Sequence, residues 1–271
     1  MIHFVGAGPG APDLITVRGL GLLRKAGMVV YAGSLVNPEL LDFARPGCEV
    51  HDSASMTLDE VIGTMRDGFA RGLDVVRLHT GDPSLYGAVR EQMDRLMELD
   101  IPFEVVPGVS SFCAAAAALN AEYTLPGVSQ TLIVTRMAGR TPVPDRESIR
   151  SLAAHGASMA LFLSAGMVED LCTALIEGGY APDTLSALVY RASWPDQKIL
   201  RAPLSDLPSL AGTEGIKKTA LVLVGNFLGN DYELSRLYDP SFEHGFRAAR
   251  ESGPKSVTGE DARTTEGATG R

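Results

Sequence analysis

The sequence predicts an α/β protein made of two consecutive α/β domains. Short apolar runs alternate with helical stretches in the first half of the chain, which is typical of a parallel sheet covered on both faces. The pattern becomes irregular at Leu125-Pro126-Gly127, and a second alternation follows. From about Arg247 onward, large apolar residues almost disappear, so this segment cannot form a core. We expect an N-terminal domain at residues 1–122, a C-terminal domain at residues 123–246 and a disordered tail at residues 247–271.

The N-terminal domain is expected to begin with a buried strand at residues 2–7. Thr16 can cap a helix over residues 17–26, which Gly27 would close. Asn37 followed by Pro38 is typical of a helix start, and the segment Thr57 to Glu60 forms a capping box. Further strands are expected at residues 28–32, 49–52, 74–79 and 103–106, and further helices at residues 58–71, 84–99 and 110–119.

The C-terminal domain shows the same kinds of signal over shorter segments. Strands are expected at residues 131–136, 159–164, 185–191, 197–201 and 219–225. Helices are expected at residues 146–154, 167–177 and 204–210.

Composition narrows the possible partners and location. The net charge is -9, which argues against nucleic acid as the main partner because phosphate binding needs a basic face. No apolar run reaches the roughly 18 residues of a membrane helix, and the first residues lack the features of a signal peptide. Cys48, Cys113 and Cys172 are widely spaced, which indicates free thiols in a reducing cytoplasm. We expect a cytoplasmic protein with no membrane partner and no protein-bound metal.

The first glycine-rich turn follows the first predicted strand. Gly6, Gly8 and Ala11 fit the GxGxx(G/A) pattern of dinucleotide-binding proteins. Pro9 and Pro12, however, lack the amide donors that a pyrophosphate would use. The second strand also ends in YAGS, without the carboxylate that would hold a ribose. NAD or FAD binding is therefore disfavoured, and a purely structural glycine turn remains an alternative.

A second glycine-containing turn, LHTGDPSLYG, follows the strand at residues 74–79. Ligands gather at the carboxyl ends of strands in open parallel sheets, so this turn is a candidate ligand loop. The alternative is structural, with Asp82 capping a helix that has Pro83 in its first turn.

Five motifs in order resemble the tetrapyrrole methyltransferase family: GAGPGAPDLIT, YAGSLVNPELL, GDPSLYGAV, VVPGVSS and LPGVSQTLIVTRMAGRTPVP. The resemblance covers residues 2 to about 228. The sequence departs from the family at Ala11, where relatives often carry Asp, and in the polar tail.

The resemblance implies two α/β domains with S-adenosylmethionine (SAM) folded in the cleft between them, and a homodimer. It also implies that the following residues bind the cofactor: Pro9, Thr80, Gly81, Asp82, Leu85, Ser110, Ser111, Ser164 and Ala192. The match to the family's motifs is weakest at Ser164 and Ala192. Relatives often carry methionine at the position of Ser164. The YAGSLVN and TRMAGRTPVP segments resemble the branch of the family that methylates carbon 11 of precorrin-4 during cobalamin biosynthesis.

Methyl transfer from a sulfonium to carbon needs a dry, preorganised pocket and no covalent nucleophile. Asp82 is the first candidate for a residue beside the reacting groups, where it would add negative potential. His79, Tyr86 and Glu91 are candidates for a base, although each residue type at such a position is more often structural.

The implied substrate is a polycarboxylate tetrapyrrole, and arginine forks bind carboxylates well. Five arginines lie near predicted loop mouths: Arg18, Arg90, Arg136, Arg140 and Arg191. Arg136 and Arg140 are the preferred substrate-binding pair because their segment is expected at the domain junction.

Three alternatives remain open at this point. The first is a family member acting at another ring carbon, such as C20 or the C2 and C7 positions of uroporphyrinogen. The second is a non-catalytic protein that binds a tetrapyrrole or a nucleotide, and the third is a nicotinamide enzyme. The sequence does not decide whether the substrate contains cobalt.

Overall fold

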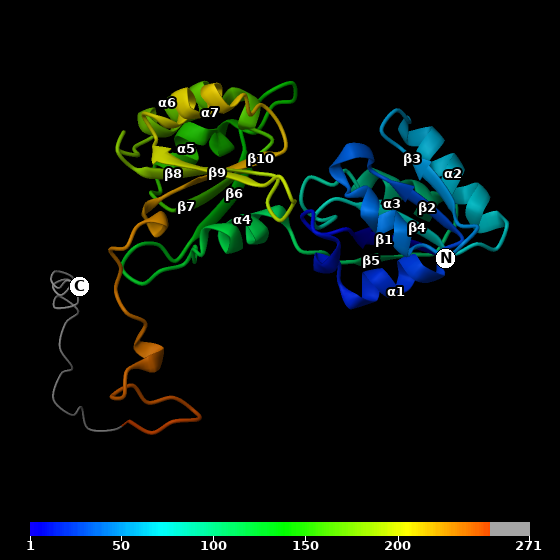
Figure 1. Cartoon of the computed structure of the whole chain (residues 1–271), viewed down its shortest axis with the longest axis horizontal. Coiled ribbons are helices and arrows are strands. Elements are labelled where there is room, and N and C mark those ends of the chain that lie inside the picture. Colours follow the sequence, from blue (N-terminus) through cyan, green and yellow to red (C-terminus); the bar gives the residue numbers. More distant parts are fainter. Residues whose placement is uncertain (250–271) are drawn as a thin grey trace, which may run out of the picture. The chain divides into compact units, whose positions relative to one another are not determined.

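The computed structural model describes residues 1–249, and residues 1–232 form one compact unit. This unit contains two five-stranded sheets with helices on their faces (Figure 1). The α/β fold class predicted from the sequence is confirmed. No helix among the described residues is long and apolar enough to cross a bilayer.

The first sheet is entirely parallel. Its strands run in the order β3-β2-β4-β1-β5, and every neighbouring pair is parallel. The strands are β1 (Ile2–Gly6), β2 (Met28–Tyr31), β3 (Glu49–Asp52), β4 (Val75–His79) and β5 (Phe103–Val106). All residues of β1 and β4 are buried, as expected for strands covered on both faces.

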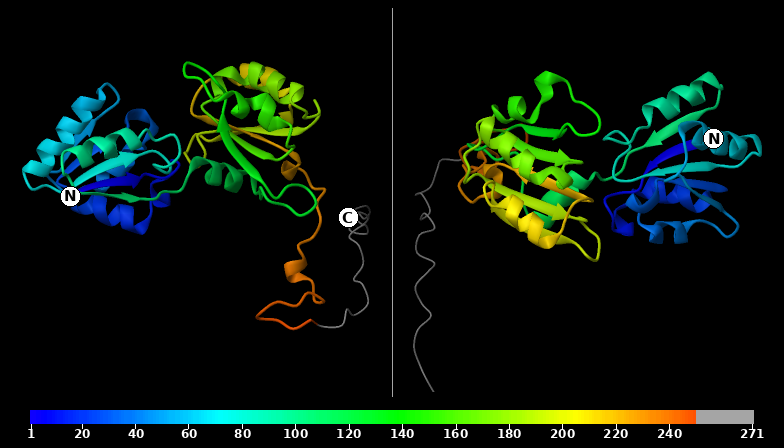
Figure 2. Two further views of the ribbon diagram at one scale, coloured as in Figure 1. Left: turned by 180° about the vertical axis from the view of Figure 1, so that it is seen from behind. Right: turned by 90° about the horizontal axis from the view of Figure 1, so that it is seen from above.

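Helices cover both faces of this sheet (Figure 2). Val5 and Leu78 pack on one face with α1 (Val17–Lys25), which Thr16 caps as predicted. Phe4 and Val75 pack on the other face with α2 (Leu58–Ala70) and α3 (Arg90–Glu98). The predicted capping box at Thr57 and Glu60 is present. Asn37 starts a 3-10 segment, Pro38–Phe43, instead of an α-helix.

The second sheet is mixed, with the strand order β6-β7-β10-β8-β9. Only β6 and β7 are parallel; the remaining pairs are antiparallel. The strands are β6 (Leu132–Arg136), β7 (Ser158–Phe162), β8 (Leu185–Tyr190), β9 (Lys198–Pro203) and β10 (Ala220–Val224). One face packs against α5 (Ile149–Ala153), α6 (Val168–Glu177) and α7 (Leu207–Glu214).

The other face of the second sheet packs against α4 (Ser111–Leu119). Ala115 of this helix shares a core with Ala160 of β7 and Leu223 of β10, so the alanine-rich sequence allows close packing of helix on sheet. By packing, α4 belongs with the second sheet although it follows β5 in the chain. The division into domains at residue 122 stays a prediction.

One predicted helix is wrong in its first part. The expected helix over residues 84–99 begins only at Arg90. Asp82 accepts the backbone N–H of Ser84, which favours a local turn, and Tyr86 and Ala88 adopt left-handed φ angles of 56° and 49°. The resulting irregular loop, residues 83–89, brings Tyr86 to the cavity described below.

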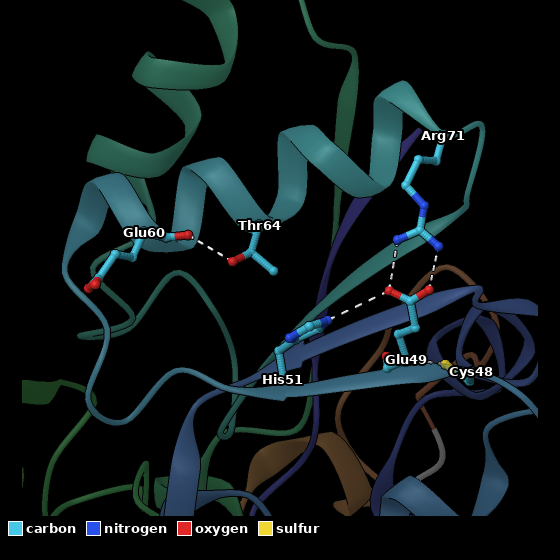
Figure 3. Close-up of polar contacts among 6 residues, drawn as sticks. All are labelled: Cys48, Glu49, His51, Glu60, Thr64 and Arg71. Atoms are coloured by element: carbon cyan, nitrogen blue, oxygen red, sulfur yellow. Dashed lines mark hydrogen bonds and ion pairs between the residues drawn. The ribbon is translucent and has the colours of Figure 1, made fainter.

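The outer strand β3 carries partly exposed polar side chains, Glu49 and His51. Arg71 at the end of α2 donates to Glu49, with 2.9 Å between Nη1 and Oε2, and His51 Nε2 lies 3.9 Å from the same carboxylate (Figure 3). Charged side chains on an edge strand discourage pairing with another chain. None of these residues lines a described cavity, so they supply a control position outside the site.

The described residues from 233 to 249 belong to a second unit. Its described part contains a 3-10 turn, Arg236–Tyr238, and Arg247 donates hydrogen bonds to the carbonyls of Leu237 and Asp239. The tail predicted at residues 247–271 falls outside the described residues from position 250 onward.

Candidate functional site

Three loops meet at the carboxyl end of the parallel sheet, after β1, β4 and β5. A Cβ on Gly6 would lie 2.5 Å from the Cα of Gly108 and 2.7 Å from the carbonyl oxygen of Gly81. The Gly81 N–H also donates to the carbonyl of Gly8 at 2.8 Å. Gly6 and Gly108 are therefore needed because the loops pack backbone against backbone, and Gly81 because its φ is 60°. This packing explains the GAGPG pattern without a pyrophosphate.

Asp82 joins two of these loops. Its Oδ1 accepts the N–H of Ser84 at 2.8 Å and the Ser84 hydroxyl, while its Oδ2 accepts the N–H of Gly108 at 2.9 Å. Burial raises the pKa of this carboxyl, but the hydrogen bonds from Ser84 and Gly108 together outweigh burial and lower it. Asp82 is therefore ionised at neutral pH and fixes the loop that carries it.

These loops and the second sheet enclose a cavity of about 480 Å³. The parallel-sheet side supplies Pro9, Leu35, Thr80, Gly81, Asp82, Leu85, Tyr86, Ser110 and Ser111. The other side supplies Phe162, Leu163, Ala165, Gly166, Val189, Arg191, Ala192, Trp194, Lys217, Lys218, Thr219, Ala220 and Leu221. The volume suits a cofactor-sized ligand.

A larger hollow of about 700 Å³ lies between α6 and α7. It has none of the predicted site residues in its lining. The smaller cavity is the candidate site because three loops from the carboxyl ends of parallel strands meet there, which is where ligands bind in open α/β sheets.

Most of the residues expected to bind the cofactor are brought together. Eight line the cavity: Pro9, Thr80, Gly81, Asp82, Leu85, Ser110, Ser111 and Ala192. Ser164 does not line it. The Ser164 side chain is fully buried, its hydroxyl donates to the Phe162 carbonyl at 2.7 Å, and its oxygen accepts the Met137 N–H at 3.0 Å. The neighbouring Leu163 and Ala165 face the cavity instead.

The two arginines expected to bind substrate, Arg136 and Arg140, do not line the cavity. The Arg136 guanidinium donates to three carbonyls in its own loop, those of Met137, Thr141 and Pro142, at 3.2, 3.2 and 2.8 Å. These bonds occupy its planar donor fork and hold the loop. Arg140 is exposed in the same loop.

Three other cations line the cavity: Arg191, Lys217 and Lys218. Arg191 follows β8, and the two lysines precede β10. Because Tyr190 pairs antiparallel with Ala220, all three cations lie at the same end of these two strands. Of these, only Arg191 is among the five arginines that the sequence places near loop mouths. Lys217 and Lys218 stand directly before a predicted strand in the sequence. Placing them at the site, however, also requires knowing that this strand pairs antiparallel with β8.

The lining also carries exposed apolar groups and an unusual number of left-handed residues. Leu35, Tyr86 and Leu163 are 50%, 44% and 67% exposed, and the rings of Tyr86 and Phe162 lie 5.2 Å apart. Four lining residues other than glycine have positive φ: Tyr86 at 56°, Leu163 at 53°, Arg191 at 46° and Thr219 at 57°. Such strain concentrates at functional sites. Apolar walls with cations at one edge suit a flat, acidic ring.

Of the three candidate bases, only Tyr86 lines the cavity. Burial raises the pKa of its hydroxyl. His79 is buried against Phe4 with 6.0 Å between the ring centroids, and burial followed by the charge of Arg77 lowers its pKa to about 3. Glu91 is exposed in the first turn of α3.

Comparison with known proteins agrees with this geometry. Residues 1–208 match the family described as Tetrapyrrole (Corrin/Porphyrin) Methylases. The chain is 50% identical over 247 residues to a cobalt-precorrin-4 C(11)-methyltransferase of Methanocaldococcus jannaschii, covering 91% of this chain and 95% of that relative.

Solved structures show the same fold. A cobalt precorrin-4 methyltransferase, CbiF, superposes with a TM-score of 0.83 at 48% identity, covering 84% of this chain and 96% of that one. A uroporphyrin-III C-methyltransferase from Thermus thermophilus, in complex with S-adenosyl homocysteine, gives a TM-score of 0.70 at 27% identity, covering 84% of this chain and 92% of that one.

Proposed function

The chain belongs to the tetrapyrrole (corrin/porphyrin) methylase family, and from that premise we propose that it methylates carbon 11 of precorrin-4 or cobalt-precorrin-4 with SAM as the methyl donor. The observation that carries the proposal is the cavity itself. Loops from the carboxyl ends of three parallel strands close it, in a chain that is 50% identical over 247 residues to a cobalt-precorrin-4 C(11)-methyltransferase.

The residues present fit SAM. Pro9, Thr80 and Gly81 offer backbone and small polar groups on one wall, and Ser110 begins α4 without capping it, which leaves its hydroxyl available. SAM, when bound, supplies an activated methyl group on a sulfonium cation. The ionised Asp82 places negative charge at this wall and so favours a cation there.

The chain's own contribution to the reaction is positioning and exclusion of water. The three packed loops form a rigid wall, so the methyl acceptor can be held in line with the donor at about 3–3.5 Å. Leu35, Leu163 and Tyr86 supply apolar contacts for the faces of a macrocycle. Arg191, Lys217 and Lys218 supply cations for its carboxylates. Tyr86 is the candidate at the cavity for relaying the proton released after methylation, because its hydroxyl, whose pKa is raised by burial, is protonated at neutral pH and can accept one proton only as it donates its own.

The rest of the proposal follows from the family resemblance. The chain would act in the cytoplasm as a homodimer, with no metal of its own. Within residues 1–249, no three His, Cys, Asp or Glu side chains are grouped as metal ligands. Any cobalt would then belong to the substrate. Analytical ultracentrifugation of the full chain tests the dimer.

One other reaction has a specific observation in its favour. The likeness to the uroporphyrin-III C-methyltransferase makes methylation of uroporphyrinogen a second candidate. Its lower identity, 27% against 48% for the precorrin-4 enzyme of known structure, favours the C11 reaction.

Calorimetric binding of S-adenosylhomocysteine, with NAD as a control, tests the cofactor class. Mass spectrometry after incubation with SAM and precorrin-4, cobalt-precorrin-4 or uroporphyrinogen III then tests the substrate. We expect binding of S-adenosylhomocysteine alone and a gain of one methyl group by a precorrin-4 form. Binding of NAD alone, or methylation of uroporphyrinogen only, would contradict the proposal.

A further inference from the structure

The turn after β8 reaches across to the first glycine loop. The hydroxyl of Ser193 accepts the backbone N–H of Ala11 at 3.0 Å, and the indole Nε1–H of Trp194 donates to the carbonyl of Pro9 at 3.0 Å. The partners are 182 and 185 residues apart in the chain. Two hydrogen bonds therefore join the second sheet to the loop that begins the cofactor wall.

Gly10 fits beneath the indole ring. A Cβ on Gly10 would overlap Cδ1 and Nε1 of Trp194, so only glycine allows the ring to lie directly on the backbone. The carbonyl of Gly10 also accepts a hydrogen bond from the side-chain amide Nδ2–H of Asn37 at 2.9 Å, and Asn37 is buried. The Pro9-Gly10 segment is thus held by contacts with both Asn37 and Trp194.

The turn that presents Trp194 is strained and held by several contacts. Arg191 and Ser193 have φ angles of 46° and 71°. The Arg191 guanidinium stacks on the Trp194 ring at 4.9 Å, and the Ser193 N–H donates to the side chain of Gln197 at 2.7 Å. Backbone strain that persists because several contacts support it is typical of functional segments.

We propose that Trp194 is a positioning residue that clamps the Pro9-Gly10 segment against the bound cofactor. This inference rests on the proposed function, because the ligand it serves is SAM. Trp194 lines the same cavity as Pro9, so its ring both closes that wall and fixes the loop that Pro9 occupies. The second sheet would then act on cofactor affinity through this contact.

Trp194→Phe removes the Nε1–H donor while keeping an aromatic ring, and Gly10→Ala forces the ring away. The matched control is Tyr180→Phe, because the Tyr180 hydroxyl also donates to a backbone carbonyl, that of Ala157, but does not line the cavity. We expect Trp194→Phe to weaken S-adenosylhomocysteine binding about 3- to 10-fold, as for one lost hydrogen bond, with a nearly unchanged unfolding midpoint. Gly10→Ala should weaken binding more, and Tyr180→Phe should leave it unchanged.

Fluorescence supplies a readout that needs no ligand, because Trp194 is the single tryptophan of the chain. In the free protein, acrylamide should quench Trp194 more strongly in Gly10→Ala than in the wild type. Equal quenching in the two proteins would overturn the clamp whether or not SAM is the ligand. Wild-type binding that persists unchanged in Trp194→Phe and Gly10→Ala would also overturn it, while leaving the proposed function intact. Failure of the wild type to bind S-adenosylhomocysteine would remove the cofactor role of the clamp together with the proposed function.

Discussion

The backbone N–H of Arg191 donates to the carbonyl of Thr219 at 3.0 Å, and both residues adopt left-handed φ angles. Left-handed backbone costs a side-chain-bearing residue roughly 1–2 kcal/mol. This hydrogen bond extends the pairing of β8 with β10 by one step past Tyr190 and Ala220. The left-handed conformations then turn both backbone segments at the cavity. Its consequence is that Arg191, Lys217 and Lys218 lie on one edge of the site.

The lysines at this edge are predicted to bind substrate carboxylates. Replacing both Lys217 and Lys218 by Ala should raise the KM for the tetrapyrrole at least about 10-fold, as expected when charged hydrogen bonds are lost, with little change in the Kd for S-adenosylhomocysteine. Lys198→Ala is the control, because Lys198 pairs with Glu214 and does not line the cavity. A loss of cofactor affinity with an unchanged KM for substrate would place the lysines on the cofactor instead.

Asp82 is predicted to act chiefly by holding its loop. Asp82→Ala removes the acceptors for Ser84 and Gly108, so cofactor binding should weaken by roughly 1–3 kcal/mol. Asp82→Asn should lose less cofactor affinity, because the remaining side-chain oxygen can still accept one of these hydrogen bonds. Calorimetry measures both, with Glu49→Gln as a carboxylate control on β3 outside the cavity. A folded Asp82→Ala variant that binds normally would remove Asp82 from the site.

The lowered pKa of Asp82 gives its hydrogen bonds a pH dependence. A carboxyl whose folded pKa is below its unfolded value stabilises the protein above the unfolded pKa. That contribution should begin to fall below about pH 4, the unfolded value, and is fully lost once the pH has fallen through the lower folded value. In Asp82→Asn, the loss of unfolding free energy at acid pH should be smaller than in the wild type. Identical acid profiles in urea titrations would show that Asp82 keeps an ordinary pKa.

His79 should make the free energy of unfolding depend on pH over a higher range than Asp82 does. Its pKa of about 3 means that the folded protein resists protonation while the unfolded chain accepts a proton below about pH 6.5. The unfolding free energy should therefore fall as the pH drops from about 6.5 toward 3, by up to about 1.4 kcal/mol per pH unit. His79→Gln should reduce this slope, and the exposed His155→Gln should not. Equal slopes in all three proteins would mean that His79 is protonated in the fold.

We predict that Arg136 affects substrate binding more than cofactor binding, and that it does so by holding its own loop. Arg136→Ala should raise the KM for the tetrapyrrole and increase proteolysis within residues 137–142, because three carbonyls lose their donor. Arg140→Ala serves as the comparison within the same loop. If Arg136→Ala lowers cofactor affinity and leaves the KM unchanged, this assignment is wrong.

Much of the fold could be predicted from the sequence because its signals are local. Thr16, Asn37 and Thr57 each have a capping side chain. The buried strands β1 and β4 are short and mostly apolar in sequence. The helix expected at residues 84–99 is too long at its start because this stretch contains no proline to end it, and the left-handed geometry of Tyr86 and Ala88 depends on tertiary contacts.

The site was predictable only where a motif carried it. The loop residues Gly81 and Asp82 are in the cavity as the resemblance implied, and so are Ser110 and Ser111. Lys217 and Trp194 come from turns next to antiparallel strands, whose pairing no local pattern reveals. Ser164 is the one expected cofactor residue outside the cavity lining, because the backbone turns at Leu163, which has a φ of 53°, and the Ser164 side chain is buried within its own loop.

The central claim is that the chain methylates carbon 11 of a precorrin-4 ring. Incubation of that substrate with SAM labelled at the methyl carbon with ¹³C, followed by NMR of the product, locates the new methyl group directly. The account predicts one labelled methyl group, bonded to carbon 11. A labelled methyl group at carbon 20 or at any other ring position would contradict it.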